Sequence, residues 1–115
     1  MEEILRILQE TGLPFAYDHF AEGESPDPPF AVYLIPESDN FSADGMAYYR
    51  QKVVNIEVYT DEKDPVLERK VEAILIRHGI FYEKSETWIP DEKMYEVLFS
   101  FETEDEEDEQ DEQGQ

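Results

Sequence analysis

The stretch from Gln51 to Gly79 constrains the fold more than any other part of the chain, because its hydrophobic period changes halfway along. Val54, Ile56 and Val58 occupy every second position, which is the pattern of a strand with one buried face. From Leu67 onward the apolar residues recur at helical spacing. The stretch therefore predicts a strand that leads through a short turn into an amphipathic helix, and a sheet is the obvious surface to cover that helix.

The ends of this helix are marked by residues with distinct backbone chemistry. Asp64 can accept an N-cap hydrogen bond, and Pro65 suits the first helical position. Gly79 can adopt the left-handed conformation that ends a helix. The spacing predicts one apolar stripe and, on other faces, several charged residues. The stripe comprises Leu67, Val71, Ile74, Leu75 and His78, and the charged residues are Glu68, Arg69, Glu72 and Arg77.

The rest of the chain supplies one more helix and four more strands. The helix is predicted around Ile4, Leu5 and Leu8, with Gly12 and Pro14 ending it. The five expected strands are Phe15–Phe20, Phe30–Ile35, Tyr48–Thr60, Ile80–Ile89 and Met94–Phe101, the last two forming a hairpin around Pro90–Lys93. This order, α-β-β-β-α-β-β, predicts an α+β fold. We expect a mostly antiparallel sheet of about five strands with both helices packed on one face.

Charge separates the chain into two parts. The segment Glu102–Gln115 carries nine of the thirty acids and no base, so we expect residues 1–101 to form a single domain and residues 102–115 an acidic, disordered tail. The net charge is −21, and removing the tail leaves about −12. Such a chain should repel free nucleic acid and anionic membranes. No apolar run resembles a signal peptide or a membrane span, so we expect a soluble, intracellular protein.

The sequence offers little that indicates catalysis. There is no cysteine, and no HExxH, GxSxG, P-loop or GxGxxG pattern is present. His78 falls at the end of a predicted helix, where a structural role is the simpler interpretation. Glu57 is the carboxylate most enclosed by apolar neighbours, yet strand alternation turns it to the opposite face, a solvated or interface position. We therefore expect no enzyme, no catalytic residues, no cofactor and no metal.

The aromatic content points to contacts with other proteins. Seven Tyr, seven Phe and one Trp exceed what one small core can hide, and partly exposed aromatic residues favour protein interfaces. The polar loop Pro36–Gly45 contains one exposed-looking aromatic residue, Phe41, and Arg50 and Lys52 are the charged candidates nearby. The candidate interface residues are Asp39, Asn40, Phe41, Ser42, Asp44, Tyr48, Tyr49, Arg50, Lys52 and Trp88.

The succession of segments resembles the tail terminator, or tail completion, proteins of long-tailed bacteriophages, especially those of phages that infect Gram-positive bacteria. The resemblance covers about Met1 to Glu102. It rests on PDPPFAVYLI, the loop SDNFSADG, the strand YYRQKVVNIEVYT, the helix DPVLERKVEAILIRHGI and the terminal hairpin. It includes no catalytic signature, and the acidic tail lies outside it.

This resemblance implies structural work in virus assembly. Such a protein forms a ring, commonly six-fold, on the head-proximal end of the tail tube, ends tube polymerisation and offers a docking surface to the head. The implied partners are further copies of the chain, the major tail tube protein and the head–tail connector protein. The implied location is the virion tail, with the host cytoplasm during assembly. An acidic channel wall would let DNA slide past without binding it.

Other classes of function remain open at this point. A head-closure or head–tail adaptor protein shares the size and the context. An acidic DNA mimic that inhibits a DNA-binding protein would explain the charge, but it needs carboxylates spaced along a rigid body. A small immunity or regulatory protein would form a one-to-one complex with a single partner and no ring.

Overall fold

The computed structural model describes residues 2–35 and 51–104, which form two helices and five strands in the predicted order α-β-β-β-α-β-β. The elements are α1 (Glu2–Thr11), β1 (Phe15–Tyr17), β2 (Phe30–Leu34), β3 (Gln51–Thr60), α2 (Pro65–Arg77), β4 (Glu83–Ile89) and β5 (Met94–Glu104). The fold is α+β, as the sequence predicted.

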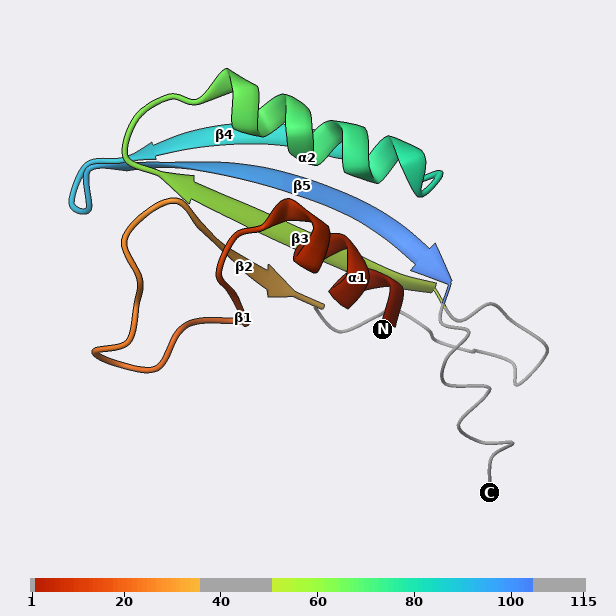
Figure 1. Ribbon diagram of the computed structural model, residues 1–115, viewed down its shortest axis with the longest axis horizontal. Coiled ribbons are helices and arrows are strands. Elements are labelled where there is room, and N and C mark those ends of the chain that lie inside the picture. The colour runs from red at the N-terminus through yellow and green to blue at the C-terminus, as the bar shows by residue number, and fades with distance from the viewer. Residues whose placement is uncertain (1, 36–50, 105–115) are drawn as a thin grey trace, which may run out of the picture.

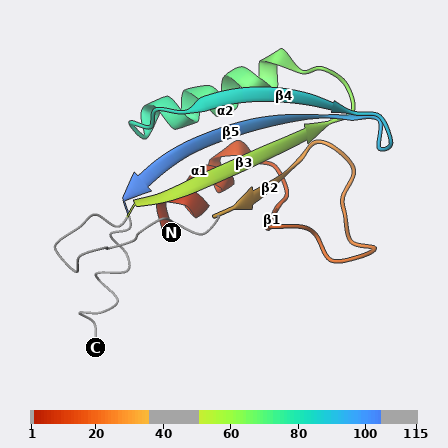
Figure 2. The same cartoon turned by 180° about the vertical axis from the view of Figure 1, so that it is seen from behind.

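The five strands make one mixed sheet in the order β1-β2-β3-β5-β4. β1 runs parallel to β2, and every other neighbouring pair is antiparallel. Helices α1 and α2 lie side by side on the same face of the sheet (Figure 1). Seen from behind, the strands lie in front, and neither α1 nor α2 crosses them (Figure 2). We call these two faces the helix side and, because neither helix lies on it, the uncovered face.

The hydrophobic core lies between the sheet and the two helices. Val54, Ile56 and Val58 of β3 are buried on the helix side, as their alternation predicted. Their partners in β5 are Phe101, Phe99 and Val97 respectively. Burying a side chain of this size contributes about 1.5–3 kcal/mol, so the central pair β3–β5 supplies much of the stabilisation. The helices add Ile4, Ile7, Leu8, Val71, Ile74 and Leu75.

The ends of α2 are set by the residues that the sequence indicated. The side chain of Asp64 accepts a hydrogen bond from the backbone N–H of Leu67 at 3.1 Å, and Pro65 begins the helix. At the other end Gly79 has φ +74°. The N–H groups of Gly79 and Ile80 donate to the carbonyls of Ile76 and Leu75, which is the Schellman arrangement.

Three strand boundaries within the described residues differ from the prediction by more than one residue. β1 ends at Tyr17 because Asp18 has φ +69°, and Phe20 then packs its ring edge-on against Phe30 at 5.4 Å between centroids. β4 begins only at Glu83, since the chain after the helix is used to pack Ile80 and Tyr82 against the core. β5 continues to Glu104, so the first residues of the segment expected to be a tail are paired with β3.

The prediction that Glu68 lies away from the buried stripe was wrong. Its exposed fraction is only 7%. The carboxylate accepts a hydrogen bond from Lys63 Nζ at 2.7 Å and lies 2.9 Å from Lys84 Nζ. Burial by itself would raise the pKa of Glu68, but the two ammonium groups outweigh it and hold that pKa below its ordinary value. A carboxylate can therefore face the sheet here, because cations from a loop and from β4 meet it.

Candidate functional site: the uncovered face of the sheet

The uncovered face is defined by the strand register. Because side chains alternate along a strand, the neighbours of the buried residues point to this second face. Pairing across the sheet brings together Ala16, Phe30, Val32, Leu34, Val53, Asn55, Glu57, Tyr59, Glu83, Ser85, Thr87, Ile89, Met94, Glu96, Leu98, Ser100 and Glu102. Four of these residues are Glu, and none of them is Lys or Arg.

One part of the uncovered face is aromatic and apolar. The rings of Phe30 and Tyr59 stack with centroids 5.2 Å apart and planes inclined by 23°. Phe20, from the connector after β1, packs its ring edge-on against Phe30. Phe30 and Val32 are buried, and Leu98 is half-buried. Phe30 and Val32 are therefore already shielded from water within the chain, and Leu98 is an apolar side chain that a partner could still cover.

The centre of the uncovered face holds two carboxyl groups. Tyr59 donates its hydroxyl hydrogen bond to Glu57 Oε1 at 2.8 Å. Glu96 sits opposite Tyr59 in the neighbouring strand and diagonally across from Glu57. Burial, and next the charge of Glu57, raise the pKa of Glu96 above its ordinary value. Burial, and next the hydrogen bond with Glu57, raise the pKa of Tyr59.

This arrangement favours an incoming cation. A carboxylate–carboxyl contact is stable only while a proton lies between the two groups, and repulsion rises when both are ionised. No Lys or Arg of the described strands points to this face to relieve the repulsion. A guanidinium or ammonium group from a partner would offset the repulsion between the two carboxylates. The site is therefore suited to binding a basic protein surface.

Most of the residues that the sequence proposed for an interface lie outside the described residues. This applies to Asp39, Asn40, Phe41, Ser42, Asp44, Tyr48, Tyr49 and Arg50. Lys52 lies in β3 opposite Thr103 and is half-buried on the helix side. Trp88 is 45% exposed, and its ring packs against Tyr95 with centroids 4.7 Å apart. Lys52 and Trp88 lie toward opposite ends of the sheet, so the structure does not bring them together.

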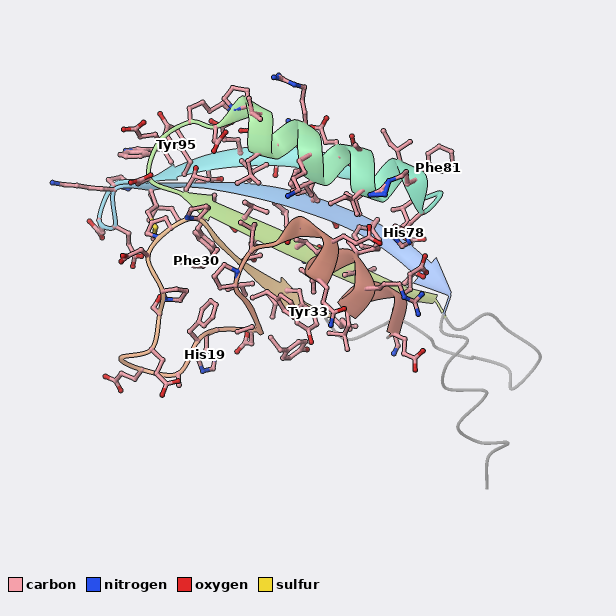
Figure 3. The ribbon with its side chains drawn as sticks, viewed as in Figure 1. His19, Phe30, Tyr33, His78, Phe81 and Tyr95 are labelled. Carbon is pink, nitrogen blue, oxygen red and sulfur yellow. The ribbon has the colours of Figure 1, made fainter. Side chains whose placement is uncertain are left out.

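Sequence reasoning recognised Glu57 but missed Glu96 and Phe81. Glu96 is one of many acids in the chain, and only the pairing of β3 with β5 places it beside Tyr59 and Glu57. Phe81 follows the helix-ending glycine and is 94% exposed. It points away from the body of the protein at the C-terminal end of α2 (Figure 3). Its position within FYEK, between a helix end and a polar strand, is the signal that could have found it.

Both histidines have carboxylate neighbours. His78 Nδ1 lies 3.2 Å from Glu3 Oε2, and His78 Nε2 lies 3.4 Å from Glu10 Oε1. This ring therefore joins the end of α2 to α1, at the place where Figure 3 labels it. His19 Nδ1 lies 2.9 Å from Asp18 Oδ2 in the exposed connector after β1. Residues 2–35 and 51–104 contain no group of three His, Asp or Glu side chains that could hold a metal ion.

A pocket of about 770 Å³ lies beside the end of α2, next to the C-terminal part of β5. Its lining mixes apolar residues such as Val53 and Phe81 with the carboxylates of Glu3 and Glu102. The pocket is open to solvent.

Neither of the two helices in the described ranges is long and apolar enough to cross a membrane.

No protein-family model matches this chain, and no curated protein matches it either.

Proposed function

We propose that this chain is a structural protein of bacteriophage assembly that caps the head-proximal end of the tail tube. In this proposal several copies form a ring, end the polymerisation of the tube and offer a docking surface to the head. The element order on which the resemblance depends, α-β-β-β-α-β-β, is the order in the structure. The ring would have six copies if it follows the resemblance.

The observation that carries this proposal is the one-sided packing of the sheet. Both helices lie on one face, and the other face presents stacked aromatic rings and half-buried carboxyl groups that neither helix covers. A domain that serves as a building block needs such a surface for its neighbours. Its acidity suits a part of the particle through which DNA passes, because like charge prevents adhesion.

The test is electron microscopy of a lysate from a phage, or an induced prophage, in which this gene is inactivated. The proposal predicts filled heads without tails beside separate tails of abnormal length. Separate heads and tails of normal length would instead assign the protein to the head side, as a head-closure or adaptor protein. Normal, joined virions would overturn a structural role.

A DNA-mimic inhibitor is the second candidate, because the structure adds an observation in its favour. Glu57, Glu83, Glu96 and Glu102 are spaced over a rigid sheet face, in addition to the acids of the C-terminal segment. A mimic would compete with DNA for a basic DNA-binding enzyme after residues 105–115 are deleted. If the deletion abolishes competition with DNA, or if the full-length chain does not compete with DNA, the sheet face is ruled out as a mimic of DNA.

A further inference from the structure

The positive charges of this acidic protein are gathered on the helix side. Every Arg and Lys within residues 2–35 and 51–104 belongs to that side or to its loops, except Lys93 in the β4–β5 turn. The uncovered face has the opposite character, with four Glu and no base among its described residues. The bases that could meet an acidic surface therefore lie on the helix side, where α2 alone carries more bases, Arg69, Lys70 and Arg77, than acids, Glu68 and Glu72.

On the helix side, the carboxylates are largely engaged within the protein. Glu68 and Glu72 pair with Lys84, and Glu10 pairs with Arg77. Lys63 is bound by Glu68 and Glu86. By contrast, three exposed cations make no ion pair with any described residue. These are Arg6 on α1 and Arg69 and Lys70 on α2.

The outer surface of α2 is also apolar. Val66 is 69% exposed and Ile76 is 63% exposed, and both lie on the same stripe as Arg69 and Ala73. The spacing of these positions, i, i+3, i+7 and i+10, is that of a helix face that packs against another surface. Arg69, which has no ion-pair partner within residues 2–35 and 51–104, lies beside these exposed aliphatic side chains and matches a surface of half-buried apolar residues and carboxylates.

We propose that the uncovered face of one copy binds the outer surface of α2 of the next copy. Arg69 would approach Glu57 and Glu96, while Val66 and Ile76 would cover Leu98. This inference rests on the proposed ring, and it names the two surfaces that build it.

Like-charge repulsion opposes a symmetric pairing of like faces. Two uncovered faces would bring eight carboxyl groups together, and two outer surfaces of α2 would oppose Arg69 to its copy. The complementary surfaces lie on opposite sides of one sheet. Contact between them is heterologous, so each copy binds two neighbours and the assembly continues until it closes.

The chain contains no cysteine, which makes the contact open to disulfide trapping. Thr87→Cys places a thiol beside Glu96 on the uncovered face, and Ala73→Cys places one on the exposed stripe of α2. The two full-length variants are mixed under mild oxidation. We expect at least fivefold more mixed dimer, with one chain of each variant, than either variant forms alone. We expect no enrichment when Asp91→Cys in the β4–β5 turn replaces Thr87→Cys.

A charge exchange provides the matched control for electrostatics. Arg69→Glu on the Ala73→Cys chain, or Glu96→Arg on the Thr87→Cys chain, should each lower the mixed dimer at least fivefold. Combining the two altered chains should restore it, because the charges again complement each other. Glu96→Arg can pair with Glu57, so the variant is expected to fold, and circular dichroism of each chain checks this.

The outcomes separate the interface from the proposed function. Equal yields of mixed and like dimers, or no restoration by the charge exchange, would overturn the interface even if rings cap tail tubes. Specific mixed dimers together with normal virions from the gene-inactivated phage would retain the interface and overturn the role in tails.

Discussion

Glu68 of α2 lies with its Oε1 atom 2.9 Å from Nζ of Lys84 in β4, and this ion pair fastens the helix to the edge strand of the sheet. Lys63 completes the cluster from the loop before the helix, 2.7 Å from Glu68 Oε2. Lys84 also reaches Glu72 at 2.7 Å. Hydrogen bonds with Glu72 and Glu68 raise the pKa of Lys84, so the cation persists across the neutral range. A network of charges, rather than apolar packing, therefore holds this corner of the fold.

Replacing Glu68 with Gln should destabilise the protein at neutral pH by about 1–3 kcal/mol, because two charge-assisted hydrogen bonds are lost. The pKa of Glu68 is lowered in the folded state. Its stabilising effect is thus present above the ordinary carboxyl pKa of 4.5 and disappears as the pH falls through the folded pKa. Urea unfolding at pH 7 and pH 2 measures this, with Glu83→Gln as an exposed control. An equal loss at both pH values would contradict the ionic account.

Replacing Glu96 with Gln should stabilise the protein at neutral pH, whereas replacing Glu68 destabilises it. The pKa of Glu96 is raised by burial and by Glu57, so between the unfolded and folded pKa values the folded state binds a larger fraction of a proton than the unfolded chain does. The native fold is therefore favoured below the ordinary carboxyl pKa and loses that advantage as the pH rises through the folded pKa. We expect Glu96→Gln to raise the free energy of unfolding by about 0.5 kcal/mol at pH 7, and to leave it unchanged at pH 3. If Glu96→Gln instead lowered the free energy of unfolding at pH 7, the contact between Glu57 and Glu96 would not be repulsive.

Replacing Gly79 with Ala should lower the stability of the C-terminal end of α2. Gly79 has φ +74°, where a Cβ atom is strained although no neighbouring atom would touch it. We expect Gly79→Ala to cost about 1 kcal/mol in thermal or urea unfolding. Gly79→Asn is the matched variant, because Asn tolerates the left-handed region and should cost less. If Ala and Asn have the same effect, the backbone conformation is not the cause.

Phe41, Arg50 and Lys52 provide a test of the interface that the sequence suggests near the β2–β3 connection. Phe41→Ala, and separately Arg50→Glu with Lys52→Glu, should reduce ring formation or capping of tail tubes without unfolding the domain. Counting capped tubes by electron microscopy measures this, with Glu92→Gln in the β4–β5 turn as the control. Undiminished capping would rule out this part of the chain as a contact.

Deleting residues 105–115 should separate the role of the acidic C-terminal segment from that of the sheet. The cut follows Glu104 because β5 extends to that residue, where it pairs with Gln51. We expect the free energy of unfolding to change by less than about 0.5 kcal/mol. Self-association should strengthen at low salt, and the difference should vanish as salt screens the repulsion. Unchanged self-association over a salt series would show that the segment does not keep copies apart.

The element order and the buried faces could be predicted because their causes are local. The alternation of Val54, Ile56 and Val58 and the helical spacing of Val71, Ile74 and Leu75 are read within a few residues. The end of β1 and the start of β4 could not be predicted from the local hydrophobic pattern. Packing of Phe20 on Phe30, and of Ile80 and Tyr82 on the core, overrides the apolar pattern there.

By itself, the sequence determined which segments are helices and strands, which of their sides are apolar, and that the protein is strongly acidic. Those properties follow from the backbone period and from composition, which need no knowledge of neighbours. Only the tertiary structure decided that Glu68 is buried between Lys63 and Lys84, and that Glu96 meets Glu57 on the uncovered face. Both depend on strand order and register, which bring together residues far apart in the chain, and a charge is stabilised or repelled by its spatial neighbours.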